Sequence, residues 1–157
     1  MIRQATAADA PMVAEIMNHV IANTTATFTT ITKSVNQVAT EITSPQPCLV
    51  AEIDGTVCGY ARYFPFRSGP GYAHVAEYSI ALSASTQGRG VGRQLLSQLC
   101  DMARADGKTQ LIGAVSSDNE TALKFHETNG FSQVGRLPDA GLKWDKPLDL
   151  IFMQKRL

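Results

Sequence analysis

The sequence predicts a single α+β domain over residues 1–157, with a mixed, mostly antiparallel central sheet flanked by helices in three layers. Two helical patterns come first, and a run of strand patterns follows them. The second half then alternates strand, helix, strand, helix, strand, strand, which adds a parallel pair to the sheet. With 44% hydrophobic residues, the chain is long enough to bury one core.

The first part of the chain reads as a short strand followed by two helices. Thr6 and Asp9 form a capping signal ahead of a segment whose apolar residues recur on one helical face. Ser34 and Gln37 form a capping box for a shorter helix. Residues 23–30, between the two helices, are polar and β-branched apart from one phenylalanine.

Strand patterns and turn signals make up most of the remaining chain. Asp54-Gly55 is a strong two-residue hairpin signal. Helical patterns cover residues 91–107 and 120–129, and Ser117 with Glu120 is the expected cap of the second of these. The other expected strands are residues 48–53, 57–64, 74–82, 111–115, 131–135 and 148–154, the last two separated by a loop.

The most informative stretch is a glycine-rich turn between a strand and a helix. Gly88, Gly90 and Gly92 remove side chains where a ligand would approach the backbone, and Arg89 and Arg93 flank them. A helix N-terminus with free amides and nearby guanidinium groups binds anions, phosphate above all. The alternative interpretation is a tight connection that binds nothing.

The spacing of this turn excludes two common phosphate loops. It lacks the lysine of G-x-x-x-x-G-K-[ST], and it does not read G-x-G-x-x-G. It does read Q-x-x-G-x-G, with Gln87, Gly90 and Gly92 at the fixed positions. This pattern resembles the pyrophosphate-binding loop of the GNAT-type N-acetyltransferases, which use acetyl-CoA.

The resemblance covers essentially the whole chain. Residues 77–82, E-Y-S-I-A-L, and residues 115–131, V-S-S-D-N-E-T-A-L-K-F-H-E-T-N-G-F, are similar to general GNAT patterns. Residues 59–67, G-Y-A-R-Y-F-P-F-R, and the tail from residue 141 are similar to the phosphinothricin or methionine sulfoximine N-acetyltransferase branch. The resemblance therefore implies the GNAT fold and a small amino-acid substrate.

Composition excludes several other classes. The formal net charge is zero, so no overall field attracts nucleic acid or an anionic membrane, and no apolar run is long enough to span a bilayer. The N-terminus lacks the apolar core of a secretory signal, and three cysteines without C-x-x-C favour structural thiols, so we expect a cytoplasmic protein. His, Cys and carboxylate residues do not cluster at the spacing of metal ligands, so we expect no metal site.

Acetyl transfer to an amine needs a base and a proton for the leaving thiolate. Glu77 matches the acidic residue of the branch and is the candidate base, and the alternative is a solvated carboxylate. His126 stands where many GNAT enzymes carry the tyrosine that protonates the thiolate. The alternative for His126 is a helix residue that only packs beside the cofactor.

The resemblance also implies a set of acetyl-CoA contacts. The backbones of Ile80 and Leu82 are expected to pair with the pantetheine arm, and the amide near Ile80 to hold the oxyanion. Asn119 is either a cofactor contact or a helix cap. The expected cofactor-binding residues are Ile80, Leu82, Gln87, Gly88, Arg89, Gly90, Val91, Gly92, Arg93 and Asn119.

Substrate recognition requires a cation for the carboxylate of an amino acid. Arg67 is the first choice and Arg62 the second, while Phe28, Tyr63 and Phe64 are expected to wall an apolar pocket. Residues 143–144 match the branch tail, where that loop helps to close the site and shape a homodimer.

The expected activity is direct, ternary-complex transfer of the acetyl group of acetyl-CoA to the α-amino group of a small amino acid. Phosphinothricin, methionine sulfoximine and methionine sulfone are the implied acceptors. Two alternatives stay open. One is acetylation of a peptide N-terminus or a polyamine, which would not need Arg67. The other is a non-catalytic acetyl-CoA-binding regulatory module, which would tolerate loss of Glu77.

Overall fold

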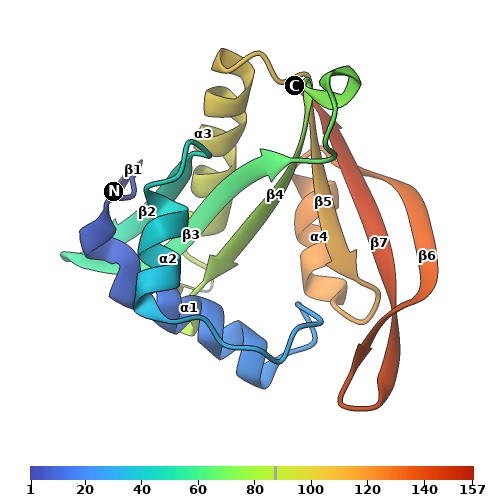
Figure 1. Cartoon of the computed structure of the whole chain (residues 1–157), viewed down its shortest axis with the longest axis horizontal. Helices are drawn as coiled ribbons and strands as arrows, with labels where there is room; N and C mark the ends of the chain where they lie inside the picture. Colours follow the sequence, from blue (N-terminus) through green and yellow to red (C-terminus); the bar gives the residue numbers. More distant parts are fainter. Residues whose placement is uncertain (87) are drawn as a thin grey trace.

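The computed structural model describes residues 1–86 and 88–157, and within them the strands form one seven-stranded sheet of order β1-β2-β3-β4-β5-β7-β6 (Figure 1). β4 and β5 run parallel, and each of the other neighbouring pairs is antiparallel. The strands are β1 (Ile2–Gln4), β2 (Cys48–Ile53), β3 (Thr56–Pro65), β4 (Val75–Leu82), β5 (Gln110–Ser116), β6 (Ser132–Lys143) and β7 (Lys146–Arg156). The expected mixed sheet is confirmed.

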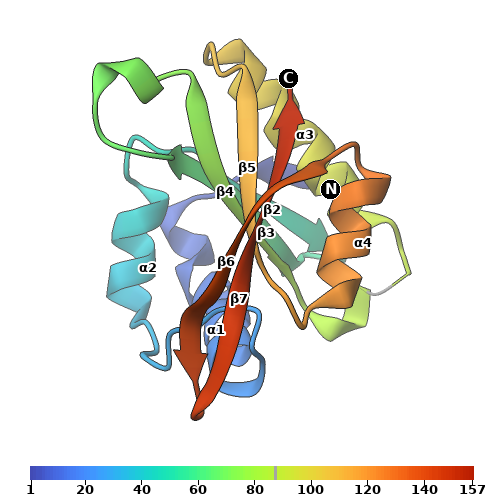
Figure 2. The ribbon, with the colours of Figure 1, turned by 90° about the vertical axis from the view of Figure 1, so that its right-hand side faces the viewer.

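Helices cover both faces of this sheet, as Figure 2 shows edge-on. α1 and α2 pack on one face over Val50, Val57 and Tyr60, and α3 packs on the other over Leu49, Ala61 and Tyr78. α4 lies on the same face as α3 (Figure 2). The helices are α1 (Ala10–Asn23), α2 (Val35–Ile42), α3 (Val91–Ala105) and α4 (Glu120–Thr128), and single 3-10 turns cover Ala7–Asp9, Pro70–Tyr72 and Ala84–Thr86.

The two capping signals near the N-terminus form as expected. Asp9 accepts a hydrogen bond from the Thr6 backbone N–H at 2.8 Å, but the first turn that it starts is a 3-10 turn and α1 follows. Ser34 accepts from the Gln37 backbone N–H at 3.2 Å, and the Gln37 side chain accepts from the Ser34 N–H at 2.8 Å.

Two local expectations were wrong. The cap of α4 is Asn119, because the Ser117 hydroxyl instead accepts from the Asp149 backbone N–H. The loop expected after residue 135 is a long twisted hairpin, in which β6 and β7 meet at a two-residue turn of Trp144 and Asp145. Both turn residues have positive φ, 51° and 59°, and the residue pair Trp-Asp does not predict this conformation.

The feature that positions the site is a local opening of the sheet. β4 pairs with β5 from Val75 to Tyr78 and then separates from it, while β5 continues along β7 as far as Ser116. The second half of β4 therefore has a neighbour on its β3 side and a gap on its β5 side (Figure 1).

Candidate active site

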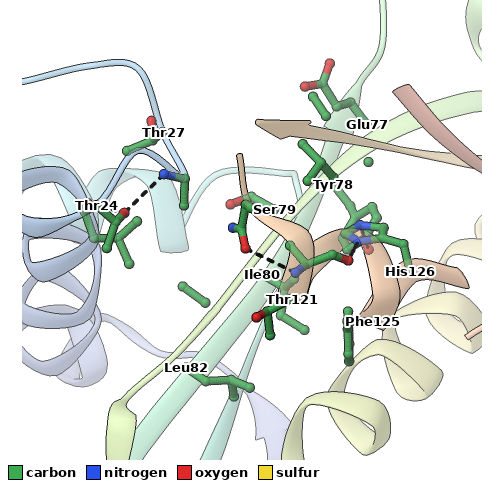
Figure 3. A pocket seen from close by; sticks show the side chains of 18 of the residues that line it. Thr24, Thr27, Glu77, Tyr78, Ser79, Ile80, Leu82, Thr121, Phe125 and His126 are labelled. Carbon is green, nitrogen blue, oxygen red and sulfur yellow. Dashed lines mark hydrogen bonds between the residues drawn. The ribbon is translucent and has the colours of Figure 1, made fainter. Parts of the chain in front are cut away.

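A cavity of about 830 Å³ fills the gap between the separated halves of β4 and β5. β4 supplies one wall, α4 and the end of β5 supply the other, and the segment after α1 closes one end (Figure 3). The residues that line it include Phe64 of β3 and, from the elements just named, Thr24, Thr27, Phe28, Glu77, Tyr78, Ser79, Ile80, Leu82, Asn119, Thr121, Phe125 and His126.

The backbone of β4 offers unpaired hydrogen-bonding groups to this cavity. The Ser83 N–H donates to the Cys58 carbonyl of β3 at 2.8 Å, and the Val75 carbonyl accepts from Phe66 on the same side. Backbone groups alternate between the two neighbours of a strand, so odd-numbered residues of β4 face β3. Ile80 and Leu82 therefore direct their N–H and C=O groups into the gap, where an extended ligand arm can pair with them.

The glycine turn lies at the start of α3, beside the same strand. Gly88 and Gly90 have positive φ of 74° and 72°, and a Cβ on either would meet open space. A Cβ on Gly92 would lie 2.8 Å from the Leu82 side chain, so this glycine lets α3 begin close against β4. Gln87 lies outside the described residues.

The first amides of α3 are not used by the hydrogen bonds of the helix itself. The Arg89 N–H is already bonded to the Thr86 carbonyl at 3.2 Å, and the helix ladder begins with Gln94 bonded to Gly90 at 3.2 Å. The first N–H groups of a helix have no partner within it, so the amides of residues 91–93 are those that α3 itself leaves unbonded. The side chains of Arg89 and Arg93 are exposed.

Tyr78 and His126 form a buried pair that connects β4 with α4. The Tyr78 hydroxyl lies 2.6 Å from Nε2 of His126, and Nδ1 of His126 lies 2.6 Å from the Ala122 carbonyl oxygen. A carbonyl only accepts, so Nδ1 carries the proton, and Nε2 of the neutral ring accepts from the tyrosine. Burial lowers the pKa of His126 and raises the pKa of Tyr78, which favours the neutral form of both.

Glu77 is half-buried and lines the same cavity from the opposite face of β4. Tyr78 belongs to the core under α3, whereas Glu77 shares the α1 and α2 face with Ser79 and Ala81. Burial raises the pKa of the Glu77 carboxyl group. Figure 3 shows Glu77 at the same end of the strand as the Tyr78–His126 pair.

Asn119 acts as a helix cap and also lines the cavity. Its side-chain oxygen accepts from the Ala122 backbone N–H at 3.1 Å, so the structural interpretation holds for that atom. Phe28 also lines the cavity, packed so closely over Gly141 of β6 that a Cβ there would overlap its ring.

Lys143 holds the segment after α1 in place. Its buried ammonium group donates to the carbonyl oxygens of Ile21, Thr24 and Thr27 at 2.7, 2.6 and 2.9 Å. Asp118 adds a second tie, because it accepts from Thr25 at 2.7 Å and from Lys146 at 3.1 Å. These bonds join the wall at Thr27 and Phe28 to the β6–β7 hairpin.

Two of the expected substrate residues lie away from the cavity. Tyr63 points to the α3 face, where it is buried and its hydroxyl donates to Asp106 at the end of that helix. Arg67 is exposed, with its guanidinium 5.4 Å from the centre of the Phe66 ring. Phe28 and Phe64 line the cavity as expected. Tyr78, Thr27 and Thr121 line it as well, and the sequence did not single them out.

The site has the parts of an acyl-CoA-dependent transferase: an open strand edge, a helix N-terminus beside a glycine turn, and acid–base groups between them. A family model described as the acetyltransferase (GNAT) family matches residues 13–131. The chain therefore belongs to the GNAT acetyltransferases, as the resemblance implied, and it is an acyltransferase that uses acetyl-CoA.

Named relatives agree with the branch. The chain is 38% identical to an L-amino acid N-acyltransferase of Escherichia coli, covering 99% of this chain and 93% of the relative. It is 35% identical to an L-methionine sulfoximine/L-methionine sulfone acetyltransferase of Salmonella typhimurium, covering 99% and 94%. A phosphinothricin acetyltransferase of Sinorhizobium meliloti, solved with acetyl-CoA, superposes with a TM-score of 0.94 at 31% identity, covering 100% and 88%.

Proposed function

We propose that this protein transfers the acetyl group of acetyl-CoA to the α-amino group of a small amino acid of the methionine sulfoximine, methionine sulfone or phosphinothricin type. One observation supports this most directly. A raised-pKa carboxylate, a Tyr–His pair and the free backbone edge of β4 all face one cavity. The names of the relatives supply the acceptor class.

The described residues fit acetyl-CoA as the acyl donor. The N–H and C=O groups of Ile80 and Leu82 would pair with the pantetheine arm, and the Ile80 amide would stabilise the oxyanion. The amides of residues 91–93 would bind the pyrophosphate, with Arg89 and Arg93 adding charge. The open space above Gly88 and Gly90 is the room that a phosphate requires. Gln87 stays a prediction from the motif.

The chain's own groups would move two protons. Glu77 would accept a proton from the ammonium group of the acceptor, so that the amine can attack the thioester carbonyl. The departing thiolate would take a proton from the Tyr78–His126 pair, in which one proton lies between the hydroxyl and Nε2. A covalent acyl-cysteine is disfavoured, because Cys48, Cys58 and Cys100 are buried and burial raises the pKa of each thiol.

The deciding experiment is free-thiol release from acetyl-CoA by purified protein, over a panel of acceptors. Turnover confined to small amino acids and their sulfoximine, sulfone or phosphinate analogues supports the proposal. Turnover confined to peptides or polyamines contradicts the acceptor assignment but is consistent with an acetyl-CoA-dependent acetyltransferase. Acetyl-CoA binding without turnover on any acceptor supports the regulatory module instead.

We also propose a homodimer in the cytoplasm. The β6–β7 hairpin exposes three large apolar side chains, Leu137, Leu142 (68% exposed) and Trp144, which supports the dimer. All three cysteines are free thiols, which supports the cytoplasmic location. No helix in the described part of the chain is long and apolar enough to cross a membrane. Sedimentation of the wild type should give a dimer and Leu142→Glu a monomer. A wild-type monomer contradicts the dimer, and recovery in the membrane fraction after cell lysis contradicts the location.

A further inference from the structure

A second cavity of about 360 Å³ adjoins the first on the α1 and α2 side of the sheet. Both are lined by Phe64, Ser79 and Ile80, so they lie side by side along the same part of β4. Met17, Val20 and Ile21 of α1 give this second cavity one apolar side. Its charged side chains are Lys33, Glu41 and Arg62.

These three charges do not balance. Glu41 accepts from Lys33 Nζ at 2.5 Å through one oxygen and from Arg62 at 2.5 Å through the other. The Glu41 carboxylate thus pairs with both cations, Lys33 and Arg62, and the three side chains together carry a net positive charge. Within residues 1–86 and 88–157, Nε of Arg62 is buried and has no hydrogen-bond partner. An unpaired buried donor of a charged group is costly, so an anion beside Arg62 would stabilise the site.

The strand register fixes where this cation stands relative to the proposed base. Arg62 lies opposite Ser79 and Phe64 lies opposite Glu77, so Arg62 and Glu77 are diagonal neighbours on one sheet face. Diagonal neighbours across antiparallel strands are about 7–8 Å apart. An amine beside Glu77 and a carboxylate beside Arg62 can therefore belong to one α-amino acid.

We propose that Arg62, held in place by Glu41, binds the α-carboxylate of the acceptor, and that this enzyme therefore selects amino acids with a free carboxylate. Arg67 does not take this role, because it is exposed and lines neither cavity. The short side chain of the acceptor would lie against the apolar residues of α1. The inference rests on the proposed function, since it names the acceptor group that the site selects.

The test compares L-methionine sulfone with its methyl ester, which keeps the amine and removes the negative charge. Arg62→Met should raise KM for the free acid about tenfold or more, the effect of losing one charge-assisted hydrogen bond. It should leave KM for the ester and for acetyl-CoA unchanged, and Arg62→Lys should restore part of the loss. Arg104→Met, an exposed arginine near the end of α3, is the matched control for loss of one positive charge.

Two further variants separate this role from a merely structural one. Glu41→Gln keeps an oxygen that can accept from Arg62 and removes only the competing negative charge, so it should lower KM for the free acid. If both Glu41→Gln and Arg62→Met weaken the acid and the ester equally, the network is only structural and the proposal fails. The proposal also fails if Arg67→Met, rather than Arg62→Met, changes the acid-to-ester ratio.

An equilibrium measurement keeps this test independent of turnover. Calorimetric titration of L-methionine sulfone into the protein with bound CoA should show binding that Arg62→Met weakens about tenfold. If the wild type binds the acid in this way but turns over no acceptor, the proposed function fails while the carboxylate site stands. If the wild type turns over free amino acids and Arg62→Met binds them as tightly, the site fails and the function stands.

Discussion

The side chains at the centre of the cavity approach it from opposite faces of one strand. Glu77 and Tyr78 are consecutive, so they point to opposite sides of β4, and they reach one space only because β5 has separated. The carbonyl of Ala122 fixes which nitrogen of His126 carries the proton, and Tyr78 occupies the other. The predicted acid, His126, is thus hydrogen-bonded to a tyrosine that the sequence did not single out.

Replacing Glu77 with glutamine should reduce kcat by about 10²-fold or more, the usual contribution of a general base. Because burial raises the pKa of Glu77 above its ordinary value, kcat/KM of the wild type should fall as the pH drops through that raised pKa and the base becomes protonated. The variant should lack this acid limb.

Steady-state kinetics across pH measure both effects. Glu127→Gln, an exposed glutamate of α4, is the control and should keep both kcat and the limb. An unchanged pH profile in Glu77→Gln would assign the base to another group.

Tyr78→Phe tests the Tyr–His pair with the ring left in place. Without the hydroxyl, Nε2 of His126 loses its hydrogen-bond partner, and the leaving thiolate would lose the proton source proposed for it. We expect kcat to fall about tenfold or more while KM for acetyl-CoA stays within a factor of two or so. Single-turnover kinetics with a saturating donor make the measurement. A normal chemical step in this variant would leave the hydroxyl with a packing role alone.

At the scale of elements, the β6–β7 hairpin supports the site from outside the sheet core. Lys143 reaches from the end of β6 to three carbonyls at the end of α1, where a cation also opposes the negative end of the helix. Phe28 packs over Gly141 of the same hairpin. The segment that closes the cavity is therefore held by residues about 120 positions away along the chain.

Lys143→Met should lower the free energy of unfolding by about 2 kcal/mol or more, because three buried or partly buried carbonyls lose a charged donor. Urea unfolding measures this loss. Lys146→Met, on the other side of the Trp144–Asp145 turn, breaks only an exposed pair with Asp118 and should cost about 0.5 kcal/mol or less. Equal losses in the two variants would contradict the special role of Lys143.

The sequence predicted elements well where local chemistry decides them, and poorly where tertiary packing does. Both N-terminal capping signals formed because they depend on residues three apart. Tyr63 was misplaced because most of β3 is buried on both faces, so apolar alternation does not tell which face a residue takes. Lys143 was expected near the site, but a hydrogen bond across 122 residues cannot be deduced from its neighbours.

For the whole molecule, the order of the elements together with the patterns in residues 77–93 and 115–131 predicted the family, the sheet and the cofactor, because a phosphate loop requires particular glycines at particular positions. The acceptor side was harder to predict. Arg62 and Glu77 come together through strand register, and register depends on the folded sheet rather than on local spacing.

Acetyl-CoA should stabilise the whole domain, because in the proposed mode it would bridge β4, α3 and α4. At 100 times its Kd, a ligand that binds only the folded state adds about 2.7 kcal/mol to the free energy of unfolding. Hydrogen exchange should locate this effect, with the amides of Ile80 and Leu82 slowed by the ligand. The amides of Ser79 and Ala81 face β3 and should exchange slowly in both states. Equal slowing at all four positions would contradict pairing along the gap.

The separated strands also have a consequence for the protein without its ligand. A strand whose polar groups lack a partner is a template for other chains, and proteins usually carry that hazard at the outer margins of a sheet. Here the unpaired backbone of β4 lies in the middle of the sheet, where α4 and the segment after α1 cover it (Figure 1). Loss of that cover, as in Lys143→Met, should make the ligand-free protein prone to aggregation, and acetyl-CoA should suppress it.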